Sequence, residues 1–177
     1  MPLLIDDSWL PLTGLTEEDL DNVIAMLEHS DRVCQIALAV KPGSQSEKVL
    51  RLMKEPFPEL THLTFSSDSK VVRSVLVPDL FLDGSAPRLR QLSMWKVSYP
   101  GLPNLLLSGT HLAELHLHDI SHSMYISPEA MVIVLATFTG FESLLLDFQS
   151  PRSRPDQEGR RPHPSTRFVI PPRSQKN

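Results

Sequence analysis

The sequence predicts an α/β solenoid with about five parallel strands on a concave face and helices and loops on the convex face. Five segments share one signature: an apolar residue, two others, an apolar residue, one other and an apolar residue. They are Val33-x-x-Ile36-x-Leu38, Leu60-x-x-Leu63-x-Phe65, Leu89-x-x-Leu92-x-Met94, Leu112-x-x-Leu115-x-Leu117 and Phe141-x-x-Leu144-x-Leu146. Their first positions are 27, 29, 23 and 29 residues apart. A period of about 20–29 residues is typical of leucine-rich repeats, in which stacked units share one core.

The first helix is expected directly after Thr16, which can cap it, and Asp19 adds favourable charge at its start. Residues 1–15 carry no such pattern and are expected to be irregular. Apolar residues then follow at the spacing of one helix face: Leu20, Val23, Ile24 and Leu27. This helix would cover the exposed end of the first layer.

The next units follow the phase of the signature. Strands are expected at 33–39, 61–66, 90–95, 113–118 and 142–147. Helices are expected at Glu47–Glu55, Leu102–Leu107 and Pro128–Phe138; Ser127 and Pro128 are typical of a helix start. Residues 67–88 are the loosest return, since Pro78 and Gly84 limit any helix there.

The chain is expected to hold one repeat domain, residues 16–148, followed by a disordered tail, residues 149–177. The tail is rich in proline, arginine and serine and has a net charge of +5; its apolar residues 168–170 fit the start of a further strand. Because the whole chain carries −4, the remaining residues carry −9. An acidic body argues against a nucleic-acid groove.

The chain has one cysteine, Cys34, so an internal disulfide is excluded. The sequence shows neither a signal-peptide pattern at its start nor an apolar run near 18 residues. We therefore expect an intracellular protein of the cytoplasm or nucleus that has no membrane partner. A small doubly wound parallel domain is the alternative fold, but the interval from Leu89 to Leu112 is short for its units of about 30 residues.

Several runs of the sequence resemble one family. The runs are Asn22–Ala25, Glu28–Ile36, Glu55–Leu63, Gly84–Arg90, Tyr125–Met131 and Phe148–Pro155. They are similar to the leucine-rich-repeat region of the F-box-like proteins of mushroom-forming fungi, over roughly residues 16–167. The resemblance implies the substrate-recognition part of a ubiquitin-ligase adaptor. No F-box helices precede Leu15, so it also implies a truncated copy that does not recruit the Skp adaptor.

Candidate partner-binding residues follow from strand alternation, because the neighbours of the signature positions point to the opposite, concave face. They are Gln35, His62, Thr64, Gln91, Ser93, Trp95, Glu114, His116, His118 and Asp147. Trp95 beside His116 and Glu114 is a candidate hot spot, since aromatic residues dominate many interfaces. The competing interpretation is that Trp95 folds over the strand edge and covers core.

The main functional hypothesis is non-enzymatic protein–protein recognition with no cofactor and no metal. The sequence contains no G-x-S-x-G elbow, no phosphate-binding loop and no H-E-x-x-H motif, so no catalytic residue is assigned. One alternative is a metal-binding protein or enzyme that uses the cluster of His116 and His118, with His111 and His122 nearby. Another is a truncated paralogue without a selected activity.

Overall fold

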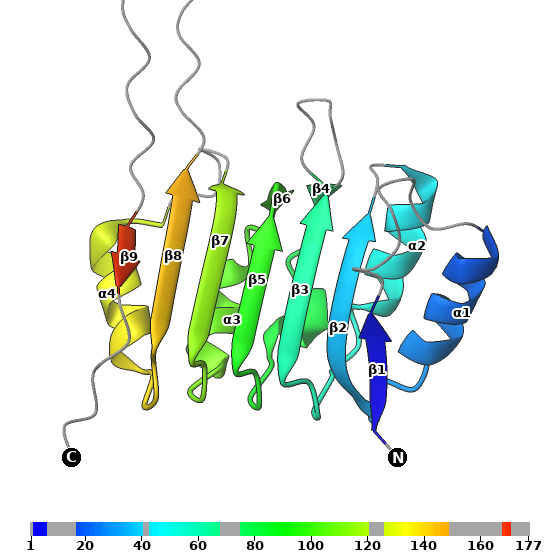
Figure 1. The fold of residues 1–177 in the computed structure, drawn as a ribbon, viewed down its shortest axis with the longest axis horizontal. Coiled ribbons are helices and arrows are strands. Elements are labelled where there is room, and N and C mark those ends of the chain that lie inside the picture. Colours follow the sequence, from blue (N-terminus) through cyan, green and yellow to red (C-terminus); the bar gives the residue numbers. More distant parts are fainter. Residues whose placement is uncertain are drawn as a thin grey trace, which may run out of the picture.

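The structure is a computed structural model that describes residues 2–6, 17–40, 43–67, 75–120, 126–148 and 168–170. It is an α/β fold in which the described helices lie along one face of a seven-stranded sheet that does not close into a barrel (Figure 1). The sheet contains β1 (Leu3–Asp6), β2 (Val33–Val40), β3 (His62–Ser67), β5 (Gln91–Trp95), β7 (Glu114–Ile120), β8 (Ser143–Phe148) and β9 (Phe168–Ile170). The helices are α1 (Glu17–Leu27), α2 (Ser44–Leu52), α3 (Leu102–Ser108) and α4 (Pro128–Ala136).

The strands follow one another in the sheet in the order of the sequence, β1-β2-β3-β5-β7-β8-β9, and the first six are parallel. This order has no reversal, whereas a doubly wound sheet reverses at its switch point and carries helices on both faces. The predicted α/β class and parallel sheet are therefore confirmed, and the described strand order is not that of the doubly wound alternative.

The signature residues form the core between the sheet and the helices. All of them are buried except Phe141, which is half-buried and packs against the core. The register aligns them across the sheet in rungs; one rung contains Ile36, Leu63, Leu92, Leu115 and Leu144. Each strand therefore shares its buried side chains with both neighbours, which is what the repeated signature predicts.

Residues 75–100 add structure that the repeat pattern does not predict. β4 (Val75–Leu76) and β6 (Val97–Ser98) form a separate parallel pair, and η1 (Phe81–Gly84) is a short 3-10 turn. The turn is bonded to the end of α2, because the amide of Leu82 donates to the carbonyl of Met53 at 2.6 Å. The expected loose return therefore contributes buried residues to the core.

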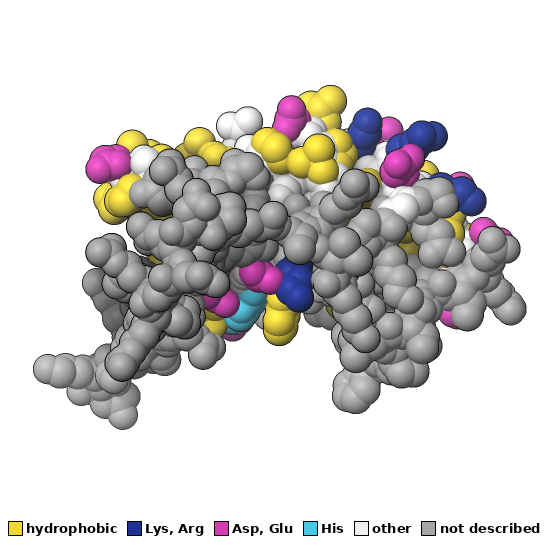
Figure 2. All heavy atoms as spheres, turned by 90° about the horizontal axis from the view of Figure 1, so that it is seen from above, with side chains coloured by type: hydrophobic (Ala, Val, Ile, Leu, Met, Phe, Trp, Pro, Cys, Tyr) yellow, Lys and Arg dark blue, Asp and Glu magenta, His cyan; other side chains and the backbone are white. Residues whose placement is uncertain are grey.

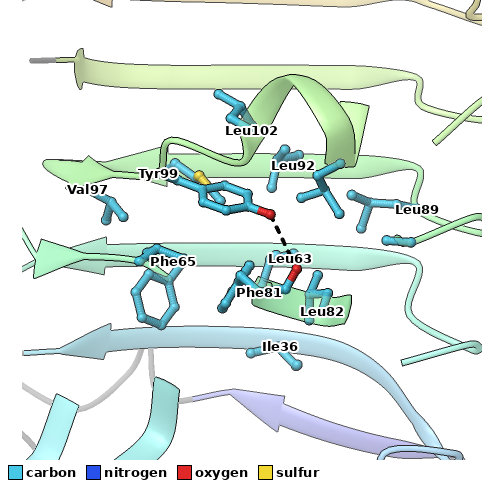
Figure 3. Close-up of a cluster of buried hydrophobic side chains, with 14 of the residues drawn as sticks. Ile36, Leu63, Phe65, Phe81, Leu82, Leu89, Leu92, Val97, Tyr99 and Leu102 are labelled. Carbon is cyan, nitrogen blue, oxygen red and sulfur yellow. Dashed lines mark hydrogen bonds between the residues drawn. The ribbon is translucent and has the colours of Figure 1, made fainter. Parts of the chain in front are cut away.

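An aromatic cluster fills the space between η1 and the sheet. The rings of Phe65 and Phe81 lie 5.9 Å apart, and those of Phe81 and Tyr99 lie 5.5 Å apart in an edge-to-face arrangement. The Tyr99 hydroxyl donates to the Phe81 carbonyl at 3.3 Å (Figure 3). Burial raises the pKa of Tyr99 from 10.0 to about 12, and the charge of Asp79 adds to the effect.

The raised pKa of Tyr99 predicts a loss of stability in alkali. The unfolded chain releases this proton from pH 10.0, whereas the folded chain holds it up to pH about 12. Stability is therefore complete below pH 10.0 and falls between the two values. Urea midpoints measured across that range should decrease for the wild type. In Tyr99→Phe this part of the pH dependence should vanish. If the urea midpoint of the variant fell with pH as steeply as that of the wild type, the alkaline loss of stability would not come from Tyr99.

Two terminal strands flank the five expected ones, and the first of them was not predicted. The N-terminal segment was expected to be irregular, but Leu3–Asp6 forms β1 parallel to β2, with Ile5 buried. Its four residues are too few to carry the signature. Phe168–Ile170, where the sequence fits the start of a further strand, forms β9, which pairs with β8 in the antiparallel direction. The rest of the tail lies outside the described residues.

Helix boundaries differ by a few residues from those expected. α2 begins at Ser44 rather than Glu47, and α4 ends at Ala136 rather than Phe138. The start of α4 is as predicted: the Ser127 hydroxyl accepts a hydrogen bond from the Ala130 amide at 3.2 Å, and Pro128 follows.

Replacing the cap of α4 should weaken the fold moderately. Ser127→Ala removes the acceptor for the Ala130 amide and should lower the free energy of unfolding by about 1 kcal/mol. Ser127→Asp restores a capping oxygen and should stay close to the wild type. Urea denaturation followed by circular dichroism measures both. Equal losses in the two variants would show that the cap does not stabilise α4.

Candidate functional site

The face of the sheet opposite the helices is called the open face here. Strand alternation places on it the residues between the signature positions, and no described helix lies against it (Figure 1). All ten predicted partner-binding residues lie on this face. Trp95 is exposed, at 52% of its accessible surface, and the others are half-buried.

The register arranges the open face in rows that cross the strands. The first row contains Gln35, His62, Gln91, Glu114 and Ser143. The second contains Ala37, Thr64, Ser93, His116 and Leu145. The third contains Ala39, Ser66, Trp95 and His118. Residues from strands far apart in the sequence therefore form one continuous surface that is largely polar.

Hydrogen bonds between neighbouring strands orient two of the histidines. The Nδ1 atom of His62 lies 2.8 Å from the Thr61 hydroxyl and 3.3 Å from Nε2 of Gln35. That hydroxyl also donates to the Cys34 carbonyl at 2.9 Å, which ties this part of β3 to β2. The Nε2 atom of His116 lies 3.2 Å from the Ser143 hydroxyl on β8.

Trp95 stacks on a histidine of the neighbouring strand. The ring centroids of Trp95 and His118 are 5.1 Å apart and their planes differ by 23°. His116 meets His118 edge-on at 6.5 Å between centroids. The three rings form an aromatic platform, and the interpretation that Trp95 folds away to cover core is wrong, because half of its surface is exposed.

Two residues beside the platform were missed by the sequence analysis. Lys96 and Asp119 follow Trp95 and His118, and both adopt the left-handed conformation, with φ of 55° and 54°. A non-glycine residue in this region costs about 1–2 kcal/mol. Because of each insertion, two consecutive residues instead of one separate the buried residues on either side. Lys96 Nζ lies 3.9 Å from Asp119 Oδ2, so the two inserted side chains form an ion pair.

The sequence does contain a signal for these insertions. The apolar alternation breaks identically in both strands, at Met94-x-x-Val97 and at Leu117-x-x-Ile120. In β7 the irregularity lies opposite Asp147 of β8, because Leu117 pairs with Leu146 and Ile120 with Phe148. Figure 2 looks onto the ends to which the parallel strands point. In this view, basic, acidic, histidine and hydrophobic side chains lie together near the middle of the molecule.

The histidine cluster does not assemble a metal site in the described part of the chain. Among those residues, no group of three or more His, Cys, Asp or Glu side chains could hold a metal ion. His111 is exposed in the turn before β7, and His122 lies outside the described residues. Cys34 is half-buried, and its thiol donates to the Leu3 carbonyl at 3.3 Å.

Comparison with known proteins gives no family model, no curated protein and no solved structure that matches the chain. Within the described ranges, no helix is both long enough and apolar enough to cross a bilayer.

Proposed function

We propose that the chain is a leucine-rich-repeat solenoid that acts in non-enzymatic protein–protein recognition, with the open face as its concave binding surface. The single observation that carries this proposal is the open face itself, on which all ten predicted residues, the exposed Trp95 among them, share one side of the sheet. In-register parallel strands in sequence order support the solenoid, because each repeat contacts only its neighbours.

The chemistry of the open face suits a protein partner. An exposed tryptophan is unusual, and tryptophan is among the residues that contribute most to binding energy at interfaces. Half-buried glutamine, serine, threonine and histidine side chains lie on the same face as Trp95 and can form a polar rim. Because these side chains stand on paired strands, little backbone conformational entropy is lost on binding.

The resemblance to the F-box-like proteins suggests which recognition this is. We propose that the open face corresponds to the substrate-selecting surface of a ubiquitin-ligase adaptor, so that its partner is a substrate-type protein. In that family the F-box recruits the Skp–cullin core. We assign only the recognition part to this chain.

The double variant Trp95→Ala/His116→Ala tests the proposal. Wild type, the double variant and a control, Val132→Ala/Ile133→Ala, are used as bait, and each prey is then purified and titrated against all three. The control removes exposed apolar side chains from α4 on the helix side. We expect the double variant to weaken binding about tenfold or more and the control to bind like the wild type. Equal affinities for all three proteins would exclude the open face.

A further inference from the structure

The open face carries an excess of negative charge among the residues that the structure describes. Its acidic residues are Asp6 on β1, Glu114 and Asp119 on β7 and Asp147 on β8. Lys96 is the basic residue beside them, and it is paired with Asp119. Neither Glu114 nor Asp147 forms an ion pair with another described residue. The face is therefore charged to attract a basic partner.

The aromatic platform provides a position for a planar cation. Trp95 is the best aromatic residue for cation–π contact, and its ring is held by the stack on His118. Asp147 lies across from the insertion that follows His118, so a carboxylate stands at the same end of the face. Arginine fits this end of the face better than lysine, because its planar guanidinium can stack on the Trp95 ring; where an arginine meets a carboxylate, it can also form two parallel hydrogen bonds.

A second acidic position lies at a defined distance from the platform. Glu114 is four residues before His118 on β7, in the first row of the open face. At about 3.3 Å per residue, the two rows are about 13 Å apart along the strand. An extended peptide covers the same distance between positions i and i+4, so two basic residues at that spacing can meet both acidic positions.

From these observations we infer that the open face binds an extended segment of a partner protein with two arginines at positions i and i+4. One arginine stacks on Trp95, at the end of the face to which Asp147 adds negative charge, and the other pairs with Glu114. The inference rests on the proposed function and specifies the chemistry of its partner. The positive charge of Lys96 opposes this binding, so a variant without that charge should bind the segment more tightly.

Synthetic peptides test the inference by fluorescence anisotropy on the full chain. The probe is a labelled peptide of glycine, serine and threonine with arginines at i and i+4, compared with glutamate and lysine versions. We expect the arginine peptide to bind about tenfold or more tighter than the glutamate peptide, and tighter than the lysine peptide. Its affinity should fall as salt is raised.

Variants locate the contact. Trp95→Ala, Glu114→Gln and Asp147→Asn should each weaken binding of the arginine peptide by about threefold or more, while Lys96→Gln should strengthen it. Glu129→Gln is the matched control, since it removes one negative charge from α4 on the helix side. Melting curves verify that each variant is folded. Equal affinity for the arginine and glutamate peptides, or an equal loss in Glu129→Gln and Asp147→Asn, would overturn the inference.

The two proposals can fail separately. A purified prey that needs Trp95 and His116 but binds without regard to Glu114, Asp147 or salt would overturn the basic-segment inference and leave open-face recognition standing. A prey unaffected by Trp95→Ala/His116→Ala would remove open-face recognition, and the basic-segment inference with it.

Discussion

Leu92→Ala is expected to lower the free energy of unfolding by about 2–5 kcal/mol. Leu92 is fully buried at the centre of the rung that joins Ile36, Leu63, Leu115 and Leu144. Truncating it leaves a cavity bordered by neighbouring rungs, and the paired strands on both sides limit how far the site can collapse. Urea denaturation followed by circular dichroism measures the loss.

Leu76→Ala is the control for this prediction. Leu76 is 67% exposed, so its truncation should change the free energy of unfolding by no more than about 0.5 kcal/mol. If both variants lost the same stability, the signature leucines would not form a shared core.

Gly101→Ala is expected to destabilise the protein by about 1–3 kcal/mol. A β-carbon at this position would lie 2.6 Å from the Asp79 carbonyl oxygen and 2.6 Å from a ring carbon of Tyr99. The oxygen belongs to the backbone and the ring is buried in the aromatic cluster, so neither can move cheaply. The backbone of Gly101 is at φ −75°, so steric contact and not dihedral strain is the cause.

Gly140→Ala separates this clash from the general effect of adding a methyl group. A β-carbon at Gly140 meets no atom within 4 Å, so this variant should unfold at nearly the wild-type urea concentration. Similar midpoints for the two alanine variants would show that the approach of Gly101 to Tyr99 does not matter.

The repeated elements could be predicted because each unit buries apolar residues at the same positions of the signature. The spacing Leu89-x-x-Leu92-x-Met94 fixes which side of a strand is buried. The phase of the repeat then predicts a helix over Pro128–Phe138, although this segment is apolar nearly all round, and α4 forms there over Pro128–Ala136. The capping oxygen of Ser127 and the following proline give its start, because they act within one turn of the chain.

The elements that were missed depend on contacts distant in the sequence. β1 has only four residues and gains its order by pairing with β2, which begins at Val33. The η1 turn is held by a hydrogen bond to the Met53 carbonyl. Its Leu82 adopts a left-handed conformation, which the sequence would indicate only if a glycine stood there. Local pattern alone carries no information on such partners.

The candidate site could also be predicted only in part from the sequence. Alternation places Trp95 and His116 on one face, because side chains in a strand point to opposite sides. The stack of Trp95 on His118 needs the lateral register between β5 and β7, which pairs these two residues and cannot be read from either strand alone. The insertions at Lys96 and Asp119 leave only a break in alternation, which is ambiguous without the register.

Disulfide cross-linking between rows tests the central claim, that the strands form an in-register parallel ladder with one open face. In a Cys34→Ser background, Ser93→Cys/His116→Cys joins register partners of β5 and β7, whereas Gln91→Cys/His118→Cys joins positions two rows apart. Residues whose Cα atoms are more than about 7 Å apart cannot be bridged without backbone movement. Mild oxidation should therefore cross-link the first pair rapidly within the monomer and leave the second reduced. Faster cross-linking of the second pair, or equal rates for both, would contradict the ladder and the open face built on it.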